Sequence, residues 1–373
     1  MGRDTLLIGA EAFWTAAAAD LAAARHRVLV QAMTFEGDAA GEAVAAAMIA
    51  STARDRRLLV DAYSLHVTND RMLPLAPGRP APVRDEARAT RALFDRIAAA
   101  GVALRITNPV GGNPLRFPLR NHKKLLVIDD CAYLGGINFS DHNFAWHDLM
   151  VRIEDAAVAG FLAADFARDW NGLPASTAGR FADLDVVSLD GSSNEAVLGP
   201  VLDLFAGARR SIEMIGAYPT LPFTEALAEA ARHGCAVTIY TPAANNKPLL
   251  RDALFALAAR SRVRLRMLPA MTHAKVALVD GERLLFGSVN FNLASYRRNG
   301  DLLAMSRDPA LIAEFERALF APARAAGVGA DEAAVSAWHR RRADLALRLG
   351  DRLLARLTHG PVRVAEWPLT RAA

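Results

Sequence analysis

The chain carries the same order of sequence patterns twice, and the matching histidines His122 and His273 are 151 positions apart. Each copy starts with a helical pattern that runs into an apolar strand, over residues 22–35 and again over 206–219. An alanine-rich amphipathic segment, a second strand, a further helix and a short strand then follow in both copies. Such self-similarity restricts the fold to a duplicated unit, because each copy must build the same elements.

The alternation of strand and helix patterns within each copy predicts the α/β class, with helices covering a sheet. The 373 residues, 52% of them hydrophobic, are enough for two such units. Gly, Pro and Ser gather between the copies, which is typical of a connection. The expected division is a first unit over 1–175, a linker over 176–195, a second unit over 196–325 and a basic helical tail over 326–373.

Composition and charge narrow the function classes only moderately. The formal charge of +4 suits an anionic partner such as nucleic acid, phospholipid headgroups or acidic metabolites. Cys131 and Cys235 belong to no C-x-x-C pair, so we expect two buried apolar residues and neither a disulfide nor a zinc site. The first residues do not resemble a signal peptide, and no run of 18 apolar residues occurs. We expect a cytoplasmic protein, either soluble or peripheral on the inner face of the cell membrane.

One motif, H-x-K-x-x-x-x-D, occurs at the same place in both copies. It comprises His122, Lys124 and Asp129 in "RNHKKLLVID", and His273, Lys275 and Asp280 in "MTHAKVALVD". The chain has only four lysines, and two of them stand two places after a histidine, which argues against ordinary strand-edge residues. On a strand, the histidine and lysine share a face, whereas the aspartate, seven positions after its histidine, has the opposite parity. We therefore assign the chemistry to the His–Lys pairs and a structural role to the aspartates.

Together with the segments "GGIN" and "GSVN" that follow them, the two motifs resemble the paired motifs of the phospholipase D superfamily. The resemblance covers about residues 10–325. The flanking segments "FWTAAAADLAAARHRVLVQAMTFEGDAAG" and "WHDLMVRIEDAAV" are similar to the bacterial cardiolipin synthase branch. The resemblance implies two α/β/α sandwich units that pack with pseudo-two-fold symmetry around one shared active site.

The resemblance also implies roles for the motif residues. His122 would attack phosphorus and form a phosphohistidine, while His273 would act as the acid and then the base. The remaining implied residues are Lys124 and Lys275 as charges on the phosphate, Asn138 and Asn290 as donors to it, and Asp148 and Asp301 as carboxylates that orient the histidines. The family more often has glutamate in the second half, so Asp301 is shorter than the typical residue.

No cluster of carboxylates and no E-x-x-H pair stands out in the sequence, and the two lysines already supply positive charge. We therefore expect no metal and no other cofactor. His142 and His147 could line the site or be solvated, and Glu36 either faces the site or, as we expect, caps the following helix.

The motif does not indicate which molecule accepts the phosphoryl group. The flanking resemblance favours cardiolipin synthase-like phosphatidyl transfer, with phospholipid as substrate and peripheral contact with an anionic membrane. Water as acceptor would make the chain a phospholipase D-type hydrolase. A nuclease or nucleotide phosphodiesterase is the alternative with nucleic acid as partner, although only 7% of residues are aromatic and no stacking platform is apparent. A non-catalytic lipid-binding module would require a damaged motif, and both motifs are intact.

Two further segments are not shared by the copies. Residues 65–86 contain four prolines and are expected to form a surface loop that could cover the site. Residues 337–360 carry six Arg against two Asp, with Leu345, Leu349, Leu353 and Leu357 four apart. We expect this tail to dock on its own domain; the alternative is an interfacial helix, in which case deletion of 331–373 would abolish binding to anionic vesicles.

Overall fold

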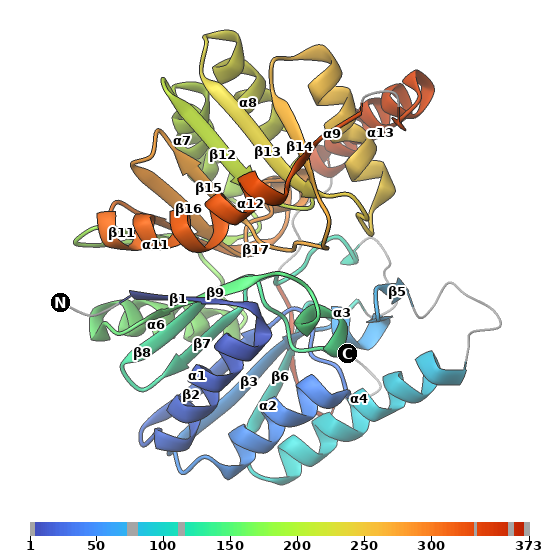
Figure 1. The fold of residues 1–373 in the computed structure, drawn as a ribbon. Coiled ribbons are helices and arrows are strands. Elements are labelled where there is room, and N and C mark those ends of the chain that lie inside the picture. Colours follow the sequence, from blue (N-terminus) through green and yellow to red (C-terminus); the bar gives the residue numbers. More distant parts are fainter. Residues whose placement is uncertain (1–3, 73–80, 111–115, 332–333, 357–361, 369–373) are drawn as a thin grey trace. The chain divides into compact units, whose positions relative to one another are not determined.

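The computed structural model describes residues 4–72, 81–110, 116–331, 334–356 and 362–368, and the chain divides into two compact units (Figure 1). The first unit contains Met1–Thr177 together with Gly360–Ala373, and the second contains Ala178–His359. Each unit has its own sheet and its own hydrophobic core.

The first unit is built on an eight-stranded sheet. In spatial order its strands are β1 (Asp4–Ile8), β9 (Leu149–Ile153), β8 (Cys131–Gly135), β7 (Leu125–Ile128), β2 (Arg27–Ala32), β3 (Asp55–Asp61), β6 (Ala103–Thr107) and β19 (Val364–Glu366). Strands β2, β3 and β6 are parallel, and the other neighbours are antiparallel.

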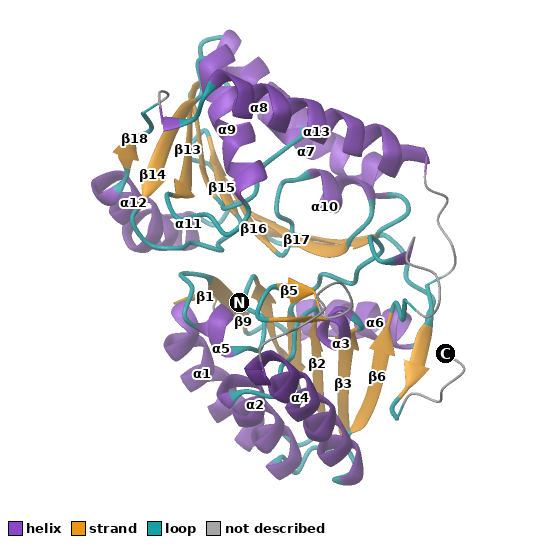
Figure 2. Ribbon diagram, turned by 90° about the vertical axis from the view of Figure 1, so that its right-hand side faces the viewer, coloured by secondary structure: helices purple, strands orange, loops and turns teal. Residues whose placement is uncertain are grey.

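Helices cover both faces of this sheet. Helices α1 (Gly9–Ala23), α2 (Ala39–Ala50) and α4 (Ala81–Ala99) share one core with alternate residues of the strands, and α6 (Ala156–Trp170) covers the other face (Figure 2). Short elements complete the unit: α3 (Tyr63–His66), β4 (Val67–Thr68), β5 (Arg71–Met72) and α5 (Asp141–Phe144).

The second unit repeats the arrangement on a nine-stranded sheet. In spatial order its strands are β10 (Thr177–Phe181), β11 (Leu184–Asp190), β17 (Gly300–Ser306), β16 (Arg283–Gly287), β15 (Val276–Val279), β12 (Ser211–Ile215), β13 (Ala236–Pro242), β14 (Arg264–Leu268) and β18 (Val328–Gly329). Its helices are α7 (Asn194–Ala206), α8 (Phe223–Arg232), α9 (Pro248–Arg260), α10 (Leu293–Arg297), α11 (Pro309–Phe315), a π-helical turn (Glu316–Phe320), α12 (Ala321–Ala326) and α13 (Ala337–Arg356).

The two sheets have the same core topology. In each sheet, three parallel strands lie beside three antiparallel ones, and the strand that follows the motif pairs with the first parallel strand. The register matches as well, because Gln31 pairs with Leu125 and Ile215 pairs with Val276, the first residues of β7 and β15. The predicted α/β class and the duplication are confirmed.

This topology places the motif histidines at a specific edge of each sheet. Strand β7 runs antiparallel to β2, so its start lies at the carboxyl ends of β2, β3 and β6. The start of β15 has the same relation to β12, β13 and β14. The carboxyl ends of parallel strands are where open α/β sheets generally bind ligands, so each histidine is at a position suited to chemistry.

The stretch that we expected to be a linker, 176–195, differs in the structure. It contains β10 and β11, and β11 pairs over seven residues with β17. Leu184, Val186 and Ser188 are buried and the residues between them, Asp185 and Val187, are partly exposed, which is the alternation of a strand near a sheet edge. Because β11 lies beside β17 as β1 lies beside β9, the second unit begins before residue 196.

The C-terminal tail is divided between the units. Helix α13 contacts α9 and α10 of the second unit, as expected of a docked tail. Strand β19 instead pairs with β6 of the first unit, and the Trp367 ring lies 5.3 Å from that of Phe94. Deleting 331–373 would remove this strand, so the deletion is not a clean test of membrane binding. Residues 332–333, 357–361 and 369–373, including Leu357, lie outside the described residues.

Three smaller expectations can be compared with the structure. Within 65–86, the described residues form parts of α3 and α4 and the β4–β5 hairpin, and 73–80 lie outside the described residues. Cys235 is buried, whereas Cys131 is only half-buried; burial raises the pKa of its thiol to about 12. Among the described residues, no helix combines the length and apolarity needed to cross a membrane.

Candidate active site

The first motif lies at the edge of the sheet rather than inside a strand. Strand β7 begins at Leu125, so His122 and Lys124 occupy the extended segment just before it. This differs from the parity argument, which treated both residues as part of the strand; the pairing with β2 begins only at Leu125, opposite Gln31. Both side chains are nevertheless buried, and the lysine is fully so.

Each motif lysine turns back toward its own histidine. Lys124 Nζ donates to the His122 carbonyl oxygen at 2.6 Å, and Lys275 Nζ donates to the His273 carbonyl oxygen. A buried ammonium that is held beside a histidine gives the site a fixed positive charge, which is what an anionic phosphodiester requires.

The second motif has a contact that fixes the tautomer of its histidine. Lys275 Nζ lies 2.9 Å from His273 Nδ1. A lysine ammonium can only donate, so Nδ1 must accept, and the proton of the neutral ring is on Nε2. A histidine in this state offers a proton from Nε2, the nitrogen remote from the backbone. The Tyr218 ring packs edge-on against it, with ring centroids 5.8 Å apart.

The asparagine and aspartate of the first unit lie at the same sheet edge as His122. Asn138 follows β8, its Oδ1 accepts from Thr34 N at 3.2 Å, and Asp148 immediately precedes β9. Asp148 Oδ1 accepts from the next residue's backbone N–H and lies against Gly136, where a Cβ would be 2.3 Å from that oxygen. A side chain at position 136 would therefore have to displace the Asp148 carboxylate.

The second unit orients its aspartate differently. Asp301 is fully buried at the start of β17, and its Oδ1 accepts from Ser288 Oγ at 2.6 Å. Ser288 takes the place of Gly136, and its own Oγ accepts from Leu302 N. Asn290, two residues later, is half-buried, and its backbone N–H donates to Ser295 Oγ. Sequence reasoning missed Ser288; the difference between "GGIN" and "GSVN" was the signal.

The motif aspartates lie at the opposite ends of their strands from the histidines. Asp129 has a φ of 49°, and its carboxylate accepts from the backbone N–H groups of residues 25, 26 and 27. Asp280 repeats this, with a φ of 53° and donors at residues 209, 210 and 211. Although burial acts in the other direction, these donors hold the pKa of each carboxyl below its usual range. Both contacts tie the end of the motif strand to the start of a parallel strand.

A buried polar network lies directly behind His122 and was not foreseen. Lys123 Nζ is 2.7 Å from Asp165 Oδ2 and 2.9 Å from Asp169 Oδ2, and all three side chains are almost completely buried. Burial disfavours the ammonium, but the two carboxylates outweigh it and raise the pKa of Lys123. Asp169 Oδ2 also accepts from Asn121 Nδ2 at 3.0 Å and from Gln31 Nε2 at 2.7 Å.

This network fixes the residue that precedes His122. The Asn121 side chain bonds Asp169 and Gln31, and its backbone N–H donates to Asp61 Oδ2 at 2.7 Å. Asp61 also forms a buried ion pair with Arg120 at 2.6 Å. These contacts hold the main chain at residues 120 and 121, immediately before His122.

The residues that build this network are replaced in the second copy. The residues at the places of Asn121 and Lys123 are Thr272 and Ala274, and Gln31 is matched by Ile215. Helices α6 and α11 both begin after a capping aspartate, and the stretch 318–323 that corresponds to the Asp165–Asp169 region reads "ALFAPA". At these positions the two copies therefore differ: the first has buried ionic groups next to His122, and the second has Thr, Ala and Ile.

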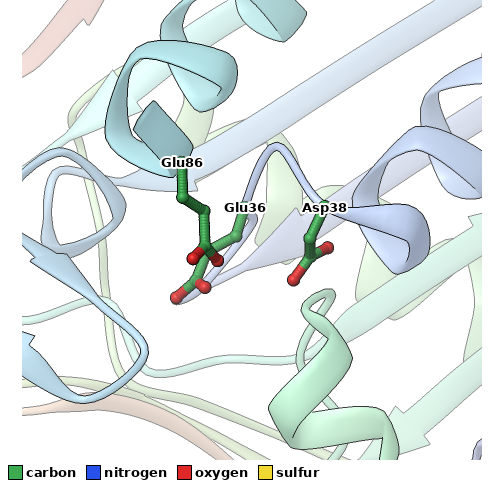
Figure 3. Close-up of side chains that lie close together, drawn as sticks. All are labelled: Glu36, Asp38 and Glu86. Carbon is green, nitrogen blue, oxygen red and sulfur yellow. The ribbon is translucent and has the colours of Figure 1, made fainter. Parts of the chain in front are cut away.

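Three carboxylates gather at the end of β2, near the same edge (Figure 3). They belong to Glu36, Asp38 and Glu86, and one oxygen of each lies within 4.8 Å of the others. The sequence predicted no metal site, and by distance this is the one group of described residues that could hold a cation. Figure 3 shows the Glu36 and Glu86 carboxyls facing each other. Burial, and then the neighbouring Glu86, raises the pKa of Glu36 to about 9, so a proton on Glu36 relieves the repulsion at neutral pH.

The expected capping role of Glu36 is wrong. The N-cap of α2 is Asp38, whose side chain accepts from Gly41 N, while Glu36 is buried and accepts weakly from Asn69 N at 3.5 Å. His142 lies 3.7 Å from Glu36 Oε2 and 3.1 Å from Ser140 Oγ, so it is part of this polar edge. His147 is exposed.

The protonation of Glu36 has a measurable consequence for stability. Its pKa is raised from 4.5 to about 9, so the folded state keeps a proton that the unfolded chain releases. The free energy of unfolding should therefore fall as the pH rises from about 5 to about 9. Glu36→Gln should be more stable than the wild type at pH 8, by on the order of 2 kcal/mol, and nearly equal to it at pH 5. Urea unfolding at both pH values measures this, with the exposed Glu11→Gln as control; an equal offset at both pH values would contradict it.

The matching family model is described as a cardiolipin synthase, PLD-like domain, and it covers residues 18–170 and 201–320. Among curated proteins, cardiolipin synthase A of Pseudomonas syringae pv. syringae is 28% identical over 62% of this chain and 53% of its own length. Cardiolipin synthase A of Proteus mirabilis is 26% identical over 52% of this chain and 46% of its own length. The chain thus spans about half the length of the curated relatives it matches.

Solved structures with the same fold include one that matches nearly end to end. The phosphatidylserine synthase of Haemophilus influenzae Rd KW20 aligns with a TM-score of 0.71 and 15% identity, over 94% of this chain and 93% of that one. The polyphosphate kinase of Porphyromonas gingivalis aligns with a TM-score of 0.58 and 13% identity, over 84% of this chain and 49% of that one. At such identities the likeness is one of fold alone.

Proposed function

This chain belongs to the family of phospholipase D-like domains of cardiolipin synthases, and we propose that it transfers a phosphatidyl group from a phospholipid to the hydroxyl of an acceptor. The observation that carries the proposal is the repeated His–Lys pair, buried and held at the carboxyl edge of each sheet. The names of the two curated relatives, both cardiolipin synthases, support phospholipid as the substrate class.

The proposed reaction has two steps that use both histidines on one phosphate. In the first step, the Nε2 lone pair of His122 attacks phosphorus, and the bond between phosphorus and the leaving alcohol oxygen breaks. His273, as an imidazolium, gives its proton to that oxygen, which leaves as a neutral alcohol, and the neutral ring is then the base of the second step. In the second step, His273 takes a proton from the acceptor hydroxyl, its oxygen attacks phosphorus, and the P–N bond breaks. Lys124 and Lys275 balance the charge of the phosphoryl oxygens throughout.

We assign attack to His122 and proton transfer to His273 because the family resemblance gives these roles to the histidines of the first and the second motif. Asn138 and Asn290 are proposed as donors to the phosphoryl oxygens, and Asp148 and Asp301 as carboxylates that orient the histidines. The mechanism uses no metal.

Lipid product analysis tests the function. Purified protein is incubated with phosphatidylglycerol vesicles in excess chelator, beside a His122→Ala/His273→Ala control, and the lipids are identified by mass spectrometry. Cardiolipin and free glycerol, formed only by the active protein, are the expected products. Phosphatidic acid in their place would reassign the acceptor to water and make the chain a hydrolase. No lipid turnover, together with cleavage of an oligonucleotide, would overturn the phospholipid assignment.

A further inference from the structure

Helix α13 has two apolar faces, and its own unit covers only one of them. Ala343, Leu347, Gly350 and Leu354 recur at the spacing of one helix face, and this face is turned toward the second unit. Helix α13 contacts α9 and α10, and Arg298 of the segment after α10 donates to the Leu354 carbonyl. Figure 2 shows α13 beside the other helices on that side of the second sheet.

The other face carries large apolar side chains in water. We call them the apolar stripe: Trp338, Leu345, Leu349 and Leu353, whose exposed fractions are 62%, 58%, 52% and 62%. At about 100° per residue, these positions fall within an arc of about 80°. They are four of the six exposed large hydrophobic side chains among the described residues. Such concentration on one helix is unusual for a free surface and marks a contact site.

Positive charge lies within and beside the stripe. Arg342 and Arg356 fall inside its arc, Arg341 and Arg352 lie along one border, and all four are exposed; we call them the arginine rim. The ion pairs of α13 with described residues involve other side chains: Arg348 with Asp344 and Glu225, and Asp351 with Arg297. The guanidinium of Arg342 lies 5.0 Å from the centre of the Trp338 ring. The anchoring of the helix to its unit therefore does not use the rim.

We propose that the apolar stripe and the arginine rim bind the surface of an anionic phospholipid bilayer. The three leucines and Trp338 would lie at the boundary between headgroups and acyl chains, with the arginines at the lipid phosphates. The choice of partner rests on the proposed function, since a phosphatidyl donor is held in a bilayer. A second copy of the chain fits this face less well, because pairing two stripes would bring two arginine rims together.

Co-sedimentation of the full chain with vesicles tests the proposal without any turnover. The wild type should bind phosphatidylglycerol vesicles, bind phosphatidylcholine vesicles at least tenfold more weakly, and lose affinity as salt rises. Leu345→Ser/Leu349→Ser/Leu353→Ser should weaken binding to phosphatidylglycerol by about tenfold or more. Arg341→Gln/Arg342→Gln should do the same by about tenfold. Leu173→Ser, at an exposed leucine of the first unit, is the matched control and should change nothing.

A second readout guards against a variant that fails to fold. Lipids brominated on the acyl chain should quench tryptophan fluorescence of the wild type, and Trp338→Phe should remove most of that quenching. Wild-type affinity in both multiple variants, equal binding to neutral vesicles, or unchanged quenching in Trp338→Phe would overturn the proposal. A wild-type dimer that becomes a monomer in the triple leucine variant would also overturn the proposal.

Turnover of a soluble short-chain phosphatidylglycerol separates this inference from the proposed function. Stripe variants that lose vesicle binding but retain this turnover support both. If the protein turns over the lipid but the stripe variants bind vesicles normally, only the proposed membrane-binding surface is overturned. If vesicle binding depends on the stripe but no turnover occurs, only the proposed activity is overturned.

Discussion

Alanine in place of His122 is expected to lower kcat for phosphatidyl transfer by on the order of 10⁴-fold or more, because the covalent bond to phosphorus can no longer form. Alanine in place of His273 should be as damaging with a natural lipid, whose leaving alcohol needs a proton. The two variants should differ when the leaving group is a nitrophenolate, which departs without an acid. His273→Ala should then release one equivalent of nitrophenolate in a burst and accumulate a phosphatidylated protein.

Intact-protein mass spectrometry and rapid-mixing absorbance measure these outcomes. The adduct in His273→Ala should map to His122, be labile in acid and disappear in the His122→Ala/His273→Ala double variant. His233→Ala, at an exposed histidine of the second unit, is the control. A burst and adduct in His122→Ala instead would exchange the two roles, and no adduct in either variant would argue for direct displacement. His122→Gln, which keeps most of the buried volume, separates lost chemistry from lost folding.

The sequence was sufficient to predict the duplicated α/β fold, because the pattern depends on local periodicity and on a spacing that occurs twice. The place of His122 and His273 at a sheet edge follows from the same pattern. The strands β10 and β11 were missed because a short edge strand is only half-buried, and its Gly- and Ser-containing neighbourhood resembles a linker. Strand β19 was missed because its partner β6 is about 260 residues earlier in the chain.

Contacts between distant residues account for what was missed at the site. Gln31 and Asp169 are 138 positions apart, and their hydrogen bond leaves no periodic signal in the sequence. The pairing of Ser288 with Asp301 is closer in sequence but depends on two adjacent strands. The sequence did point to Lys123, because it is one of only four lysines and lies within the motif. Its counterpart in the second copy is Ala274, so the motif itself does not require a lysine there.

The network behind His122 leads to the second large effect. Lys123→Met should lower the free energy of unfolding of the first unit by about 3–5 kcal/mol, because it leaves the buried carboxylates of Asp165 and Asp169 without their cation. Urea unfolding followed by Trp170, which lies on the same helix as both aspartates, measures it. In an Asp165→Asn/Asp169→Asn background the same substitution should cost far less, since no buried charge is left unpaired. An equal cost in both backgrounds would mean that Lys123 acts only by filling space.

The same network should also affect turnover through Asn121. Asn121→Ala removes the side-chain contacts to Asp169 and Gln31 but leaves the bond from its backbone N–H to Asp61. We expect kcat to fall by roughly 10- to 100-fold with little change in KM, because a looser main chain misplaces the attacking His122 without altering substrate contacts. Thr272→Ala makes the matched change beside His273, where the residues that build the network are replaced, and should cost less. Equal losses in both variants would show that the network stabilises the fold without positioning the nucleophile. The expected difference would show that His122 must be positioned more accurately than His273.

Attack on phosphorus depends on the direction of a lone pair, and proton transfer to a nearby oxygen tolerates more movement. A buried ionic network next to His122, whose members are replaced by Thr272, Ala274 and Ile215 in the second copy, is consistent with that inequality.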